Sequence, residues 1–172
     1  MARPNKINLR AFQQELSERL KHKTLGEVES LRLALESGGA SWLVRLGDTG
    51  EVLPCPAPVS VPLTKPWFLG VANIRGSLYG MVDFGQFLTG EPSKRGIGAR
   101  LVLLGPRFAE MRAGLVVNRV LGLRNLSDFS PVEGGGPRAW ASRTWRDKTE
   151  VEWRELDLAR LVQDQQFLEV GM

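Results

Sequence analysis

The sequence predicts a mainly β protein built as small barrels or a sandwich, with helices at its two ends. Short apolar stretches of strand length recur from about residue 40 to residue 154, and glycine-rich turns separate them. The longer apolar patterns at helical spacing lie before and after this region. The chain has 172 residues, 42% of them apolar, which is enough for one domain with a packed core.

The first 39 residues predict a helical N-terminal extension. A first helix is indicated by apolar residues at helical spacing, namely Ile7, Phe12, Leu16 and Leu20. A second helix is expected from Gly26 to Ser37 and ends at Gly38-Gly39; its apolar residues are Val28, Leu31, Leu33 and Leu35. We expect these helices to pack on the domain that they precede or to remain partly free of it, and partner binding is the alternative.

Residues 40–170 predict a single domain of short strands. Trp42 to Leu46 alternates as a strand does, and after the turn at Asp48-Thr49-Gly50 the chain can return as a second strand, Glu51 to Leu53. Five prolines between Pro54 and Pro66 exclude a regular helix or a central strand, so we expect an extended surface connector. Further strands are predicted at Gly70–Ile74, Ser77–Asp83, Arg100–Leu104, Arg112–Val120, Arg138–Thr144 and Glu150–Arg154.

Short helices and loops complete the predicted domain. Phe84 to Leu88 is expected to form one helical turn ended by Gly90, and the glycines at 134–136 predict a flexible loop. Asp157 is a suitable N-cap for a closing helix, whose apolar face holds Leu158, Leu161 and Val162.

The basic charge of the chain is concentrated near its start. The net charge is +4 and the pI is about 9.6, and residues 1–24 alone carry +4, so the rest is neutral. Within that rest, Lys94 to Arg124 is basic and Asp147 to Glu169 is acidic. A nucleic-acid-binding barrel is therefore an alternative function, but the basic run lacks the interleaved aromatic residues typical of such proteins.

Residue types for catalysis or metal binding are scarce. The chain has one histidine, His22, and one cysteine, Cys55, which predicts no metal site, internal disulfide or nucleophile–histidine pair. It has no phosphate-binding or dinucleotide-binding glycine loop. We therefore expect a protein that is not an enzyme and needs no cofactor. The lone cysteine, with neither a secretory pattern nor an apolar run of about 20 residues, predicts a cytoplasmic protein without membrane insertion.

The middle of the chain has a strand–turn–strand pattern with unusual residue choices. Gly70 and Gly76 permit positive φ or a close backbone approach. Asn73 can hold the turn through hydrogen bonds to the backbone, and Arg75 can offer its guanidinium to a carboxylate. Asp83 ends the second strand and can cap the helical turn that follows.

This segment resembles the signature of CheW-like domains. The run Gly70-Val71-Ala72-Asn73-Ile74-Arg75-Gly76, followed by Met81-Val82-Asp83-Phe84, is similar to the family's "G-x-x-N-[LIV]-R-G" turn and "V-x-D-L" strand end. The strand Gly114 to Gly122 and the closing helix Leu156-Asp157 to Leu161 are similar to two further elements of that family. The resemblance spans Ser41 to about Val162.

The resemblance implies a fold, a function and partners. The fold is two small five-stranded SH3-like β barrels about a shared apolar core. The function is a non-catalytic signalling adaptor in receptor arrays, which binds the regulatory domain of a CheA-type histidine kinase and the cytoplasmic tip of a methyl-accepting receptor. Arg75 matches the family's receptor-facing arginine, with Asn73 and Gly76 shaping its turn, whereas Gly70 and Asp83 are structural.

Several features depart from the common family pattern. Proline is usual where Gly80 stands, and aspartate where Asn118 stands, so a salt bridge typical of that second site should be absent here. The long extension, the proline connector and the run Arg119 to Asn125 are similar to PilI-type adaptors, which serve chemosensory systems of type IV pili and twitching motility. A CheW of flagellar chemotaxis is the alternative within the family.

Overall fold

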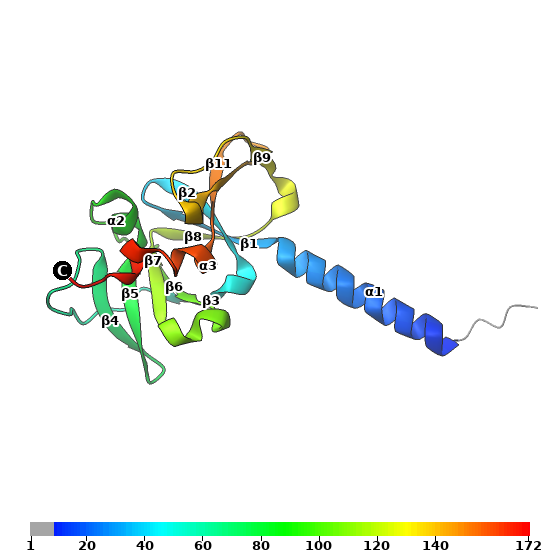
Figure 1. The fold of residues 1–172 in the computed structure, drawn as a ribbon, viewed down its shortest axis with the longest axis horizontal. Coiled ribbons are helices and arrows are strands. Elements are labelled where there is room, and N and C mark those ends of the chain that lie inside the picture. Colours follow the sequence, from blue (N-terminus) through cyan, green and yellow to red (C-terminus); the bar gives the residue numbers. More distant parts are fainter. Residues whose placement is uncertain (1–8) are drawn as a thin grey trace, which may run out of the picture.

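Two β sheets form the body of the protein in the computed structural model, which describes residues 9–172 (Figure 1). The first sheet contains, in spatial order, β8 (Arg119–Asn125), β1 (Leu31–Ser37), β2 (Ala40–Arg45), β11 (Glu152–Leu156), β10 (Arg143–Arg146) and β9 (Ser130–Val132). The second contains β3 (Thr49–Pro54), β6 (Arg100–Leu104), β7 (Ala113–Val117), β5 (Ser77–Asp83) and β4 (Phe68–Ile74). All neighbours are antiparallel except β11 with β2 and β5 with β7, which are parallel.

Short helices connect and close these sheets. The α-helices of the body are α2 (Phe84–Thr89), α3 (Leu158–Leu161) and α4 (Gln165–Leu168). The 3-10 turns are η1 (Leu46–Asp48), η2 (Pro106–Met111), η3 (Leu126–Asp128) and η4 (Ala139–Ala141). The predicted helical turn after Asp83 and the closing helix after Asp157 are both present, and α4 is an additional turn.

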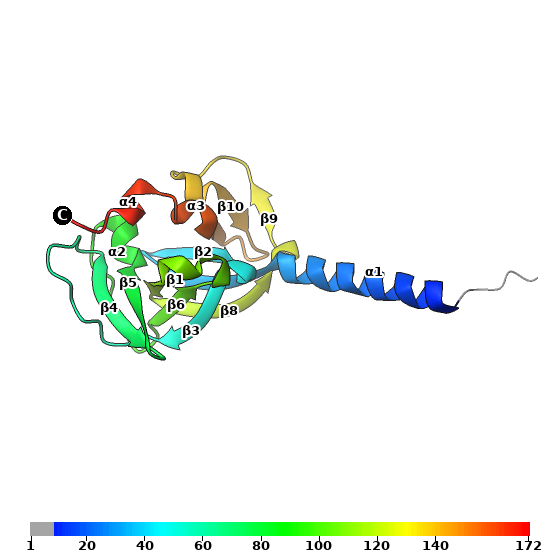
Figure 2. The same ribbon diagram turned by 60° about the horizontal axis from the view of Figure 1, so that its bottom comes forward.

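A long N-terminal helix, α1 (Leu9–Ser30), projects away from both sheets (Figures 1 and 2). Its residues 24–29 are exposed, so this stretch is not buried against the domain. The predicted apolar position Ile7 lies outside the described residues. Across residues 9–172, no helix combines the length and the hydropathy that a membrane span requires.

The predicted second helix is wrong over residues 31–37, which form strand β1. Leu33 and Leu35 face the core between the sheets, whereas Ala34 faces the interior of the first sheet. Both faces of the strand are therefore buried. Leu31, Leu33 and Leu35 alternate as in a strand, but Leu31 and Leu35 also stand at helical spacing from Val28. This run can be mistaken for a helical pattern because periodicity alone does not distinguish the two cases.

Several predicted strands are present with different partners or bounds. The strand after the Asp48 turn is β3, but it pairs with β6 and belongs to the other sheet, so β2 and β3 form no hairpin. The predicted strand 112–120 is divided at Asn118 into β7 and β8, one in each sheet. Most of the predicted strand 138–144 is the turn η4, and β10 begins only at Arg143.

The largest apolar core lies between the two sheets. Strands β1 and β2 contribute alternate residues to it, and strands β6 and β7 do the same from the second sheet, with Trp42, Phe84 and Trp140 among the largest buried side chains. The intervening residues of these strands face two smaller cores, one inside each sheet. One shared core and two small internal cores are what two joined, strongly curved sheets require.

The second sheet curves until its two edge strands approach each other. Glu51 of β3 and Arg75 beyond β4 are in contact although these strands are at opposite edges. The connector also pairs with β4, because Val59 and Val71 exchange two backbone hydrogen bonds of 2.8 and 2.9 Å. The predicted mainly β fold is confirmed, but the first sheet has six strands instead of five, and in residues 9–172 neither sheet is closed by pairing of its edge strands.

Candidate functional site

The candidate site is the tight turn that joins β4 to β5. Ile74 pairs with Ser77, so the turn consists of only Arg75 and Gly76. Both residues have positive φ, 51° and 85°, as a type I′ hairpin turn requires. The side-chain oxygen of Asn73 accepts a hydrogen bond of 2.8 Å from the backbone N–H of Gly76, which holds the turn.

The Arg75 side chain projects from this turn into solvent. It is 77% exposed, and its Nη2 donates to Glu51 Oε1 at 2.7 Å. An exposed ion pair of this kind stabilises a fold by only about 0–1 kcal/mol. The guanidinium is therefore held in place without being needed for stability, and its remaining N–H groups can meet an acidic partner.

Gly70 serves the connector rather than the turn. Its φ is 122°, and a Cβ atom at this position would lie 2.0 Å from the backbone oxygen of Val59. The absence of a side chain lets the proline-rich connector lie directly on β4 and form the Val59–Val71 hydrogen bonds. At Gly80, where the family usually has proline, an added Cβ atom would lie 3.1 Å from the Phe68 ring.

Asp83 is a buried capping residue at the end of β5. Its Oδ1 accepts from the backbone N–H of Gln86 at 3.0 Å, which caps α2, and from the hydroxyl of Ser93. Its Oδ2 accepts from the backbone N–H of Ser93 at 3.2 Å, so one carboxylate holds both α2 and the loop after it. The structure thus places Asn73, Arg75 and Gly76 together in one turn, whereas Gly70 and Asp83 lie elsewhere on the same hairpin.

Sequence reasoning did not identify Glu51, the ionic partner of Arg75. The two residues are 24 positions apart: Glu51 lies in β3 at one edge of the sheet, and Arg75 follows β4 at the other edge. Nothing in the local sequence of β3 indicates this contact, since it arises only from the curvature of the sheet. Asn118, where the family usually has aspartate, is uncharged, and its side-chain amide donates to the Lys94 carbonyl at 3.1 Å.

The residue types suited to catalysis or metal binding do not form a cluster in residues 9–172. His22 is exposed on α1, and Cys55 is a partly buried free cysteine. Within residues 9–172 there is no group of three or more His, Cys, Asp and Glu side chains suited to a metal ion. The predicted basic run is partly neutralised, because Arg107 pairs with Asp48 and Arg119 with Glu36.

Comparison with known proteins agrees with this architecture. Residues 33–166 match the CheW-like domain family. Protein PilI of Pseudomonas aeruginosa is 32% identical over 93 residues, which are 54% of this chain and 51% of that protein. The alignment therefore spans about half the length of this curated relative.

A solved structure shows the same fold. It is the scaffolding protein TtCheW from Thermoanaerobacter tengcongensis, with a TM-score of 0.62 and 14% identity over 74% of this chain and 88% of that one. The match to the family covers both sheets, from β1 to α4. The chain therefore belongs to the CheW-like domain family.

Proposed function

We propose that this protein is a non-catalytic cytoplasmic adaptor that couples a methyl-accepting receptor to a CheA-type histidine kinase. The proposal rests on its membership of the CheW-like domain family and on its similarity to PilI, which favours a chemosensory system that controls type IV pili and twitching. A rigid two-sheet body with an exposed polar turn suits a protein that holds two partners in a fixed geometry. Such an adaptor transmits a signal because each receptor state biases the kinase differently.

The observation that carries the proposal is the presentation of Arg75. A two-residue turn fixed by Asn73 and Gly76 limits the backbone positions from which the guanidinium can reach a partner. Preorganisation of this kind lowers the entropy lost on binding. Arg75 is therefore proposed as a receptor contact, with Asn73 and Gly76 as the residues that position it.

Glu51 would compete with a receptor carboxylate for the Arg75 guanidinium. In the free protein its carboxylate occupies part of the guanidinium fork, so a receptor carboxylate either shares Arg75 or displaces Glu51. Loss of the pair costs little, because Arg75 and Glu51 are 77% and 38% exposed. The site can therefore exchange partners without disturbing the hairpin.

Calorimetry with purified partners tests the proposal. The full chain should bind the regulatory domain of a CheA-type kinase from the same genome with one-to-one stoichiometry. Arg75→Ala should weaken binding of a receptor tip fragment by about tenfold or more, the usual range for losing a charge-assisted contact, and leave kinase binding unchanged. Unchanged receptor affinity in the folded variant would contradict the assignment of Arg75.

Arg119→Ala is a matched control. Arg119 is also exposed, at 63%, and also pairs with a carboxylate, that of Glu36. It lies on β8 in the other sheet, so the same loss of charge occurs away from the turn. Equal weakening by both variants would show a general charge effect rather than a site at Arg75, and no binding of any such kinase would remove the adaptor function.

The pathway is a separate part of the proposal. The aligned PilI region favours pili, and a flagellar CheW is the alternative within the family. Deletion of the gene in its host, with twitching and swimming measured side by side, distinguishes the two. Loss of twitching alone supports the pilus assignment, and loss of swimming alone contradicts it.

A further inference from the structure

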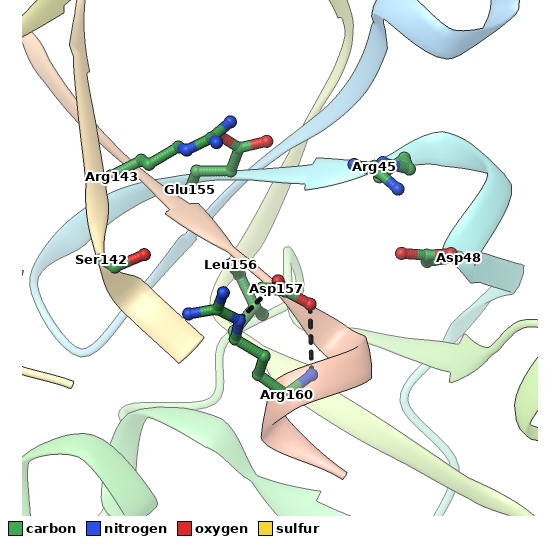
Figure 3. A pocket seen from close by; sticks show the side chains of 8 residues that line it. All are labelled: Arg45, Asp48, Ser142, Arg143, Glu155, Leu156, Asp157 and Arg160. Atoms are coloured by element: carbon green, nitrogen blue, oxygen red, sulfur yellow. Dashed lines mark hydrogen bonds and ion pairs between the residues drawn. The ribbon is translucent and has the colours of Figure 1, made fainter. Parts of the chain in front are cut away.

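A polar cavity lies at the carboxyl ends of the parallel strands β2 and β11 (Figure 3). Its volume is about 120 Å³, comparable to about four water molecules at liquid density. Leu156 forms the apolar part of its wall, and the remaining lining side chains are charged or hydroxylic. The cavity is distinct from the Arg75 turn, which belongs to the other sheet.

The three carboxylates that line this cavity are already paired. Asp48 accepts from Nη1 of Arg107 at 2.9 Å. Glu155 accepts from the buried Arg32, whose Nη2 lies 3.2 Å away, and also from the indole N–H of Trp145. The third carboxylate, Asp157, pairs with Arg160 at 3.4 Å and caps α3, as the dashed lines in Figure 3 show. None of the three therefore contributes an uncompensated negative charge.

Two arginines remain without an acidic partner. Arg45 ends β2 and Arg143 begins β10, and they lie on opposite sides of the cavity (Figure 3). Both are exposed, and among the described residues neither forms an ion pair. Ser142, next to Arg143, turns its hydroxyl toward the middle of the cavity, and Glu155 lies between the two arginines in this view (Figure 3). The lining alone holds three arginines and three carboxylates; with Arg32 and Arg107 counted as the partners of Glu155 and Asp48, the site has an excess of two positive charges.

We propose that this cavity binds a phosphate group, as a free anion or as the end of a small phosphate ester. Planar guanidinium groups donate paired hydrogen bonds to phosphate oxygens, and a doubly charged anion matches the two unpaired arginines. The Ser142 hydroxyl supplies a further donor. The cavity is large enough for the phosphate group, so the rest of an ester lies outside it.

The position of the cavity gives the occupant a structural effect. The chain leaves β2 through η1 and enters β3 of the second sheet, and Asp48 of η1 is held by Arg107 of η2. A phosphate between Arg45 and Arg143 therefore joins this connection between the sheets to the β10–β11 hairpin. Binding to the folded state alone raises stability with the logarithm of the phosphate concentration once that concentration exceeds Kd.

Amide chemical shifts recorded during a titration with inorganic phosphate at constant ionic strength test the proposal. Saturable shifts are expected at Ser142, Arg143 and Asp157. Arg143→Gln and Arg45→Gln should each weaken the fitted affinity by about tenfold, because each removes one charged donor. Both side chains are exposed and unpaired, so these variants should retain the fold.

Arg95→Gln is the matched control, since it removes one exposed positive charge from the loop before β6, outside the cavity wall. It should bind phosphate as the wild type does. Acetate, a singly charged carboxylate, should bind at least tenfold more weakly. The proposal would be overturned if the Arg45→Gln/Arg143→Gln double variant showed the same shifts as the wild type, or if acetate bound as tightly as phosphate. A phosphate monoester that binds more tightly than free phosphate would identify an ester as the occupant.

Discussion

Substitution of Gly70 by alanine should destabilise the protein far more than a typical exposed glycine substitution. The new Cβ would lie 2.0 Å from the backbone oxygen of Val59, whereas ordinary contacts begin near 3.4 Å. The connector must therefore withdraw by about 1.4 Å, the difference between these two distances. That movement breaks both hydrogen bonds between Val59 and Val71, each with a net contribution of about 1 kcal/mol.

Backbone strain adds to this loss. A residue with a side chain at a φ of 122° costs about 1–3 kcal/mol. Together with the lost hydrogen bonds, Gly70→Ala should lower the free energy of unfolding by about 3–5 kcal/mol. Urea denaturation should report this change as a lower midpoint with an unchanged slope.

Gly134→Ala separates the two contributions. Gly134 has a similar φ of 113°, but a Cβ atom there would meet nothing within 4 Å. Its substitution should cost only the strain, about 1–3 kcal/mol. Equal destabilisation by the two variants would refute the reasoning, because the close approach of the connector would then contribute nothing. Faster amide exchange at Val71 in Gly70→Ala alone would locate the damage at the connector.

Three further outcomes follow from individual side chains. Hydrogen bonds from Thr149 and Trp153 lower the pKa of Asp147 from 3.8 to about 2, so the carboxylate stabilises the fold fully above pH 3.8 and loses this effect as the pH falls towards 2. Asp147→Asn should therefore lose less stability than the wild type over that range, and identical pH profiles in acid denaturation would contradict this. Burial raises the pKa of the Cys55 thiol, so iodoacetamide should alkylate it more slowly at pH 8 in folded protein than in urea, as mass spectrometry can measure. Asp83→Ala should lower the free energy of unfolding by about 1–3 kcal/mol, because it removes the cap of α2 and leaves buried N–H groups unpaired; a change within 0.5 kcal/mol in urea melts would argue against a structural role.

Local chemistry was predictable from the sequence because its partners are close along the chain. Asn73 and Gly76 form their turn within four residues, and Asp83 and Asp157 cap helices that begin at the next residue. Glycine, asparagine and aspartate have strong conformational preferences at such positions whatever lies around them. The family signature is itself made of these local elements, which is why the family could be identified from the sequence.

Features that depend on distant contacts were decided by the tertiary structure. Residues 31–37 became a strand because β8 and β2 provide hydrogen-bonding edges on both sides of them, and β3 joined β6 rather than β2 for the same kind of reason. The strand prediction at 138–144 failed where Trp140 became buried in the shared core. The division of the chain at residue 39 stays a prediction, and the pairing of β1 favours an earlier boundary.

By itself the sequence determined that the protein is mainly β, that its proline-rich passage is extended and that Arg75 stands at a tight turn. Only the tertiary structure decided that Glu51 meets Arg75, that the connector crosses Gly70, and that Arg45 and Arg143 line one cavity. Short-range preferences depend on a few covalently linked residues, whereas these contacts exist only after two curved sheets have packed.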